Sequence, residues 1–368
     1  MKIKKIVALS AAIGVALSGV ALASPAFADP VSNSYSLVGS DTLDSVTNAL
    51  VNGTSVTGST VRITAGGASI GSFDAFGSAT IQTKPRGVYF TRPAGSGAGR
   101  DALRASMWVP GNVGGNTYLG KVVTGQVDIA RSSSGPGTNQ NAAGKLLYVP
   151  FARDAVGYAY KGGTDAWASL TPAQLKQIFD GTLTSVDGVA ITPRLPQAGS
   201  GTRNFWLSAL GYSGTTAPGV SDTGNTTAEN DASVLANGQI IPFSVANWVA
   251  QANGLTSSNT TTIAGVALGS PVAGAVPFTG TGAALVPNPT FYADTTFGRD
   301  TYYIVERARV TVGDPSYDAK LATLVDTTKA NGLTNFSTAL ASQPGSVKKK
   351  YGFLAPLSAT PIPAYVNG

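Results

Sequence analysis

A short turn of small residues, Gly199-Ser200-Gly201-Thr202, carries the chemistry that the sequence marks most clearly. The apolar run at 205–210 follows it, so we expect the turn to open a helix. The N–H groups in the first turn of a helix have no intrahelical partners and can bind an anion. Arg194 and Arg203 on either side can add positive charge. The turn therefore predicts one wall of an oxyanion-binding site.

Three further loops share this composition, and each follows a predicted strand. They are Gly39-Ser40-Asp41-Thr42, Gly95-Ser96-Gly97-Ala98-Gly99-Arg100 and Arg131-Ser132-Ser133-Ser134-Gly135. Because α/β folds place their ligands at the carboxyl ends of the strands, we expect all of these loops to gather there. Each loop taken alone is also compatible with ordinary turn chemistry, since Gly and Ser are common in turns of every kind.

Catalysis and metal binding are disfavoured by the residue types that are missing. The chain contains no histidine and no cysteine, which removes the usual Ser-His-Asp base and makes a zinc site unexpected. Gly67-Ala68-Ser69-Ile70-Gly71 matches the nucleophile-elbow pattern, but without a base we interpret it as a chance match. The glycines at 95, 97 and 99 lack the spacing of a dinucleotide fingerprint. We expect no catalytic residue, no metal and no cofactor.

Composition and the first residues indicate an exported globular protein. Hydrophobic residues make up 43% of the chain, which is ample for a core. The net charge is +6, and removal of the three lysines within residues 1–28 lowers it to +3, which is too mild for a nucleic-acid-binding surface. A basic start, an apolar stretch at 6–23 and Ala26-Phe27-Ala28 predict a signal peptide at 1–28. Without a cysteine, no lipid anchor is expected. We expect a monomer that acts outside the cytoplasmic membrane, at the cell surface, in the medium or in a periplasm.

Alternating strands and helices position these loops. The predicted strands are 35–38, 61–65, 88–91, 127–130, 146–150, 156–160 and 302–310. The predicted helices are 43–50, 172–180, 318–328 and 335–341. The helix at 172–180 has the clearest signals, with Thr171 as N-cap, Pro172 at its first position and Gly181 at its end. The alternation predicts an α/β fold with largely parallel sheets, and the length favours two lobes.

Several of these segments together resemble the phosphate-binding protein of high-affinity phosphate ABC importers, in particular its actinobacterial forms. The matching segments, in the family's order, are Val38-Gly39-Ser40-Asp41-Thr42, Arg92-Pro93-Ala94-Gly95-Ser96-Gly97, Asp128-Ile129-Ala130-Arg131-Ser132-Ser133, Leu170-Thr171-Pro172-Ala173-Gln174-Leu175-Lys176-Gln177-Ile178-Phe179-Asp180-Gly181 and Gly199-Ser200-Gly201-Thr202. The most specific part is the Leu-Thr-Pro helix followed by Gly-Ser-Gly-Thr. The resemblance extends from about residue 35 to about residue 357.

The resemblance implies a type 2 periplasmic-binding-protein fold, in which two α/β lobes joined by two crossing strands hold a ligand in the cleft between them. By analogy, lobe one is 29–153 plus 300–368, and lobe two is 154–299. It also implies an exported, non-enzymatic protein that captures inorganic phosphate and passes it to the membrane subunits of an ABC importer. The candidate ligand-binding residues are Ser40, Asp41, Thr42, Ser96, Gly97, Arg131, Ser132, Ser133, Arg194, Ser200, Gly201, Thr202 and Arg203.

This chain departs from the family's pattern at two positions. The family has Ala-Ser-Asp where this chain has Arg131-Ser132-Ser133, so the carboxylate that accepts the proton of monohydrogen phosphate is missing. The family's binding arginine lies where this chain has Pro196, which leaves Arg194, Arg203 and Arg131 as the alternatives. Asp41 is the available replacement acceptor, because an ionised carboxylate accepts a proton from phosphate and repels sulfate. Asp41 could instead be a helix cap.

Two other functions are compatible with the same residues. A protein of this fold without a cognate importer would be a released surface or scaffold module. A secreted hydrolase that uses aspartate or serine is disfavoured by the absence of histidine.

Overall fold

The computed structural model describes residues 29, 34–107, 117–220 and 227–365. The predicted signal peptide at 1–28 lies outside the described residues. The strands are β1 Tyr35–Gly39, β2 Ile70–Ser72, β3 Thr80–Ile81, β4 Phe90–Thr91, β5 Thr117–Tyr118, β6 Lys121–Val122, β7 Ile129–Ser132, β8 Leu146–Lys161, β9 Ser185–Val186, β10 Val189–Ala190, β11 Thr192–Pro193, β12 Gln239–Ser244, β13 Val266–Gly269, β14 Phe278–Thr279, β15 Val286–Pro287, β16 Gly298–Glu306 and β17 Ile362–Ala364.

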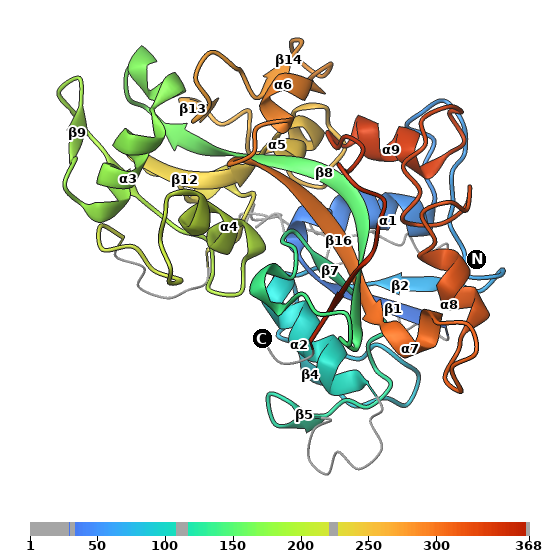
Figure 1. Cartoon of the computed structure of the whole chain (residues 1–368). Coiled ribbons are helices and arrows are strands. Elements are labelled where there is room, and N and C mark those ends of the chain that lie inside the picture. Colours follow the sequence, from blue (N-terminus) through green and yellow to red (C-terminus); the bar gives the residue numbers. More distant parts are fainter. Residues whose placement is uncertain (1–28, 30–33, 108–116, 221–226, 366–368) are drawn as a thin grey trace, which may run out of the picture.

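Helices cover the strands in both halves of the molecule (Figure 1). The α-helices are α1 Asp44–Asn52, α2 Ser96–Ser106, α3 Pro172–Asp180, α4 Gly201–Ala209, α5 Val245–Ala252, α6 Pro289–Tyr292, α7 Arg307–Val310, α8 Ala319–Leu324 and α9 Pro344–Lys350. The 3-10 helices are η1 Asp41–Leu43, η2 Gly137–Asn139, η3 Asp165–Ser169 and η4 Ala232–Val234. None of the helices in the described ranges is long and apolar enough to cross a membrane.

A mixed sheet with the strand order β11-β12-β8-β16-β7-β1-β2 forms the framework. We call the part around β1, β2 and β7 the first lobe, and the part around β11, β12 and β13 the second lobe. Strand β1 pairs parallel with β2 and β7, whereas β16 and β8 are antiparallel to their neighbours. The prediction of an α/β two-lobed fold is confirmed. The prediction of largely parallel sheets is wrong, because the central pairings are antiparallel.

Strands β8 and β16 join the two lobes (Figure 1). The start of β8 pairs with β16 and β17 in the first lobe, and its end pairs with β12 and β13 in the second. The sequence predicts two strands here, because Arg153 and Asp154 interrupt the apolar run. In the structure both charges are compensated: Arg153 Nη1 lies 3.1 Å from Asp300, and Asp154 lies 2.8 Å from Arg299. The strand therefore continues through them.

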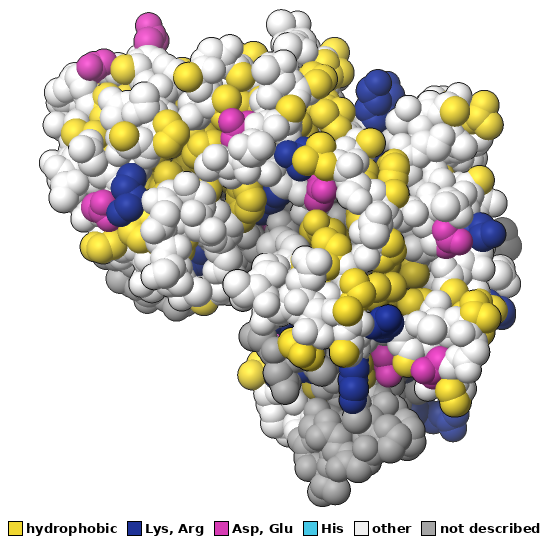
Figure 2. Space-filling model, in the orientation of Figure 1, with side chains coloured by type: hydrophobic (Ala, Val, Ile, Leu, Met, Phe, Trp, Pro, Cys, Tyr) yellow, Lys and Arg dark blue, Asp and Glu magenta, His cyan; other side chains and the backbone are white. Residues whose placement is uncertain are grey.

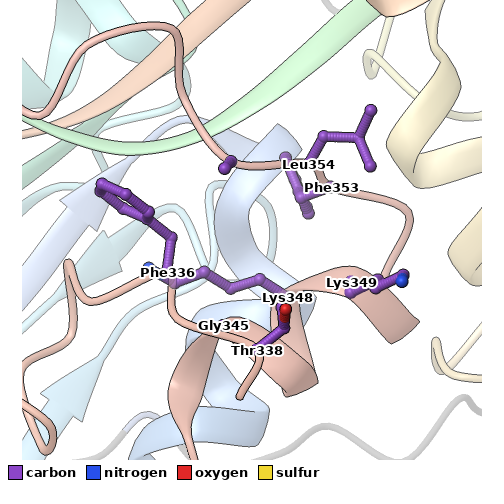
Figure 3. A pocket seen from close by; sticks show the side chains of 8 residues that line it. Phe336, Thr338, Gly345, Lys348, Lys349, Phe353 and Leu354 are labelled. Carbon is purple, nitrogen blue, oxygen red and sulfur yellow. The ribbon is translucent and has the colours of Figure 1, made fainter. Parts of the chain in front are cut away.

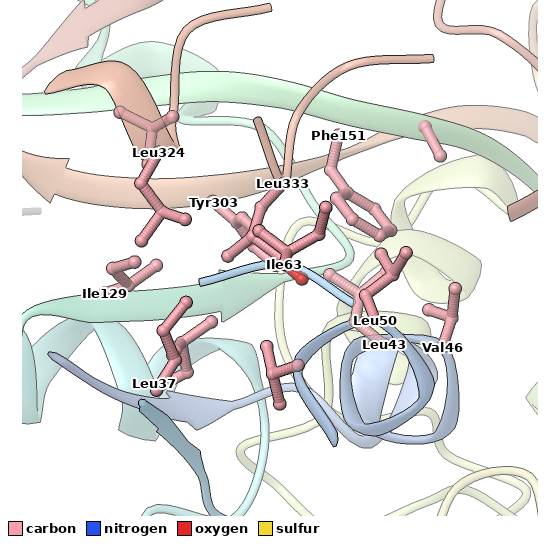
Figure 4. Close-up of a cluster of buried hydrophobic side chains, with 14 of the residues drawn as sticks. Leu37, Leu43, Val46, Leu50, Ile63, Ile129, Phe151, Tyr303, Leu324 and Leu333 are labelled. Atoms are coloured by element: carbon pink, nitrogen blue, oxygen red, sulfur yellow. The ribbon is translucent and has the colours of Figure 1, made fainter. Parts of the chain in front are cut away.

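Alternating side chains of the sheet supply separate hydrophobic cores on its two faces. Leu37 and Val38 are neighbours on β1, yet they belong to different cores, as the period of two in a strand requires. Figure 4 shows the core that Leu37 joins, where Leu43 and Leu50 pack beneath Phe151 and Tyr303. The second lobe has its own cores, which include Trp206 and Phe243.

Local signals explain which predicted helices form. Helix α3 has Thr171 as N-cap, as predicted, within a capping box in which Thr171 accepts a hydrogen bond from the Gln174 N–H, and it ends at Gly181 in the left-handed conformation. The helix predicted at 335–341 is wrong. Asn335 Oδ1 there accepts a hydrogen bond from the Ser337 N–H, 3.1 Å away, and the helix starts only at Pro344.

The run of three lysines at 348–350 predicts an exposed helix end. The exposure of Lys348 contradicts this prediction. Only 2% of Lys348 is exposed, and its Nζ donates to the carbonyl groups of Phe151 and Asn335 at 2.9 Å. The pattern of α9 explains this, because Val347 and Lys348 both face the core while Lys349 and Lys350 face solvent.

Candidate anion-binding site

The Gly/Ser loops converge where the two lobes meet. Strands β1 and β7 run parallel with Gly39 opposite Arg131, which places the loops that follow them at the same edge of the sheet. Gly39 also forms a bridge to Ala94, just before α2. Three of the four loops that the sequence predicts to gather therefore meet through backbone pairing in the first lobe.

The fourth loop approaches from the second lobe, at the start of α4. The Gly97 N–H donates to the Gly199 carbonyl at 3.4 Å. Ser133 N–H donates to Ser96 Oγ at 3.0 Å, and a Cβ atom on Gly201 would overlap both serine hydroxyls. Only glycine fits at position 201, because the N-terminus of α4 packs directly against the two serines.

Four donors from these loops point at one carboxylate, that of Glu229. Glu229 Oε1 accepts from Ser40 Oγ at 3.4 Å and from Thr42 Oγ1 at 3.2 Å. Glu229 Oε2 accepts from Ser200 Oγ and from the Thr202 N–H at 3.1 Å. We call Ser40, Thr42, Ser200 and Thr202 the cradle. It holds an anionic group between donors of both lobes.

Arg299 at the start of β16 is the arginine that contacts the cradle most directly. Its Nη2 donates to Thr202 Oγ1 at 2.8 Å and to Asp154 Oδ2 at 2.8 Å. The residue is 4% exposed, and its Nη1 has no hydrogen-bond partner in the described part of the chain. Arg299 thus places a buried positive charge, one donor of which is unused, beside the cradle.

The three arginines that the sequence singles out have other partners. Arg131 contacts Asp44 and donates to Ser72 Oγ at 2.6 Å. Arg194 Nη1 donates to the Val234 carbonyl at 3.2 Å. Arg203 donates to the carbonyls of Pro196 and Thr215, both at 2.8 Å. These contacts fix the loops and the sheet edge that carry the cradle.

The remaining candidates lie in the loops around the cradle. Ser96 Oγ and Ser133 Oγ are 3.2 Å apart and line the contact with Gly201. Ser132 Oγ donates to the Ser134 carbonyl at 2.7 Å, within its own loop. The structure thus brings most of the predicted residues to one place, and it adds Glu229 and Arg299.

Asp41 and Glu229 form a buried carboxyl pair at the cradle. Burial, as the largest cause, and the neighbouring Glu229 charge raise the pKa of Asp41 well above its usual value. Burial also raises the pKa of Glu229, but Asp41, the Arg299 charge and the Ser200 and Thr202 donors outweigh it and lower that pKa. The opposite directions of these two pKa shifts favour a proton on Asp41 over one on Glu229. Burial likewise raises the pKa of Asp44 to about 7 against the opposing charge of Arg131.

A separate cavity of about 170 Å³ lies in the first lobe, beside α9 (Figure 3). Its lining includes Phe336, Lys348 and Phe353, and none of its residues belongs to the cradle. The described residues contain no group of three His, Cys, Asp or Glu side chains arranged to hold a metal ion.

Comparison with known proteins places this architecture in a family. Residues 25–343 match the family model described as a PBP superfamily domain. The chain belongs to the PBP superfamily. No curated protein matches the chain.

Two solved structures share the fold of this superfamily member. An ABC-type phosphate transport receptor from Vibrio cholerae has 15% identity and a TM-score of 0.50, and the match covers 88% of this chain and 100% of that one. A protein from Clostridium perfringens, described as a phosphate ABC transporter substrate-binding protein with bound phosphate, has 14% identity and a TM-score of 0.52, with the same coverage.

Proposed function

We propose that this protein is an exported, non-enzymatic substrate-binding protein that captures inorganic phosphate in the cradle and delivers it to a membrane ABC importer. The observation that supports this proposal most is the donor set. Three hydroxyl groups and one backbone N–H from two lobes point at one anionic group, with the Arg299 guanidinium beside it. Such donors match the oxygens of a tetrahedral oxyanion.

The fold and its relatives support the same assignment. Two lobes joined by β8 and β16 can close on a ligand by a hinge motion. Of the two solved structures with this fold, one is described as an ABC-type phosphate transport receptor and the other as a phosphate ABC transporter substrate-binding protein. On the face shown in Figure 2, Lys and Arg side chains are scattered and form no single basic patch, which fits a small anion as ligand better than nucleic acid.

The remaining assignments belong to this proposal. We propose lobe boundaries at 29–153 plus 300–368 and at 154–299, removal of a signal peptide at 1–28, no lipid anchor, and a monomer. The predicted ligand-binding residues also remain part of it, with Arg299 added.

Calorimetric titration with phosphate tests the function. The protein without its first 28 residues, after removal of carried-over anions, is expected to release or absorb heat with phosphate. Ser200→Ala removes one cradle hydroxyl, and we expect phosphate affinity to fall about tenfold or more, since a hydrogen bond to a charged group contributes about 1.5–3 kcal/mol.

Ser208→Ala is the matched control, because Ser208 is an exposed residue of the same helix α4. It should bind phosphate like the unchanged protein. Absence of phosphate binding in the unchanged protein would reject the proposed function.

A further inference from the structure

The carboxylate of Glu229 already occupies the cradle. Its two oxygens accept all of the cradle's donors, one oxygen from Ser40 and Thr42 in the first lobe and the other from Ser200 and Thr202 in the second. Only 3% of Glu229 is exposed. The side chain therefore makes the contacts that a bound oxyanion would make, and it connects the two lobes.

The charges around the cradle disfavour the binding of a second anion beside Glu229. Arg299 is paired with Asp154, and Arg131 is paired with Asp44. Glu229 adds a further negative charge, which the pair Arg299–Asp154 does not neutralise. An anion that entered beside Glu229 would meet a like charge in a buried site and compete for donors that are already used.

We infer that Glu229 is a tethered internal competitor, whose carboxylate must leave the cradle before a free anion can bind. This inference rests on the proposed function for the identity of that anion. The apparent affinity equals the intrinsic affinity multiplied by the fraction of time for which the carboxylate leaves the cradle free. An occupancy of about nine-tenths would weaken binding about tenfold. The occupancy of the cradle by Glu229 would also set the anion concentration at which half of the protein molecules have bound an anion.

Phosphate titrations of Glu229 variants test the competition. Glu229→Ala removes the carboxylate, and Glu229→Gln keeps its volume without its charge. We expect both variants to bind phosphate about tenfold more tightly than the unchanged protein. Glu306→Gln, which changes the chain's only other glutamate at the end of β16, should leave the affinity unchanged. Unchanged or weaker binding in both Glu229 variants would overturn the inference, since Glu229 would then be a structural group or a direct phosphate contact.

A second readout is independent of phosphate. Glu229→Ala leaves the cradle donors without a partner, and formate can supply the missing carboxylate. Formate should raise the melting temperature of Glu229→Ala and leave that of Glu306→Gln and the unchanged protein where they are. If formate has no effect on Glu229→Ala, the inference fails. A third outcome separates the two proposals: formate stabilises Glu229→Ala, but phosphate binds to none of the proteins. In that case the inference about Glu229 stands, and phosphate is rejected as the ligand.

Discussion

Asp41 and Glu229 are two carboxyl groups beside the cradle, and we propose that they determine which anions the site accepts. The carboxyl oxygens of Asp41 and the Glu229 side chain are buried, and the pKa of Asp41 is raised while that of Glu229 is lowered. A protonated Asp41 can donate a hydrogen bond to any oxyanion. An ionised Asp41 accepts the proton of monohydrogen phosphate and repels sulfate. We therefore expect the charge state of Asp41 to govern selectivity.

We predict that sulfate binding weakens as pH rises through the pKa of Asp41. Burial, the Glu229 charge and the Asp44 charge raise that pKa above 3.8. At pH values below this pKa, Asp41 is neutral and can donate a hydrogen bond to sulfate. At pH values above it, the Asp41 carboxylate repels sulfate. The dissociation constant for sulfate should therefore increase by up to about tenfold for each pH unit. Titrations with sulfate across the pH range in which the protein stays folded measure this, because sulfate keeps its charge at each of these pH values.

Asp41→Asn provides the comparison, because an amide donates at every pH. Its sulfate affinity should not change across the same range. A flat profile in the unchanged protein, equal to that of Asp41→Asn, would return Asp41 to a purely structural role beside η1.

The residues that sequence reasoning missed share one property: their roles depend on burial. Glu229 lies in a polar segment that resembles any surface loop, and nothing adjacent in the sequence indicates that it enters a cradle 189 positions from Ser40. Arg299 stands at the start of an apolar strand, which is a weak signal for a buried charge. Ser200 and Thr202 were predictable, since small polar residues before an apolar helix carry their own chemistry.

At the scale of elements, the contact between the N-termini of α4 and α2 brings the lobes together. The structure lets the start of α4 approach Ser96 and Ser133 only because residue 201 is glycine. Helix α3 illustrates what local signals achieve, since Thr171, Pro172 and Gly181 determine both of its ends. Strand β8 illustrates their limit, because the ion pairs that carry it past Arg153 and Asp154 come from β16.

Gly201→Ala should separate the two helix ends and distort the cradle. The added methyl group overlaps the Ser96 and Ser133 hydroxyls, so we expect phosphate affinity to fall at least about tenfold, with a stability loss of about 1–3 kcal/mol from overpacking. Calorimetry and thermal unfolding measure the two effects.

Gly214→Ala is the matched control, because a Cβ atom there meets no atom within 4 Å. It should behave like the unchanged protein. Full phosphate affinity in Gly201→Ala would show that the contact between α4 and the serines does not shape the site.

At the scale of the whole molecule, a two-lobed fold surrounds one cradle, which the Glu229 carboxylate occupies. Strands β8 and β16 connect lobes that have their own cores, and the cradle lies where loops from both lobes meet. The alternation of strands and helices predicts the α/β class, and the chain length predicts the two lobes. The mixed sheet order is not predictable from the pattern, because antiparallel pairing of β8 with both β12 and β16 depends on contacts distant in sequence.

A crystal structure of the protein grown with phosphate tests the central claim most directly. The account predicts a tetrahedral anion bound by Ser40, Thr42, Ser200 and Thr202, beside Arg299, with the Glu229 carboxylate withdrawn. Glu229 still bound to those four residues in crystals saturated with phosphate, with no anion in the cradle, would contradict it.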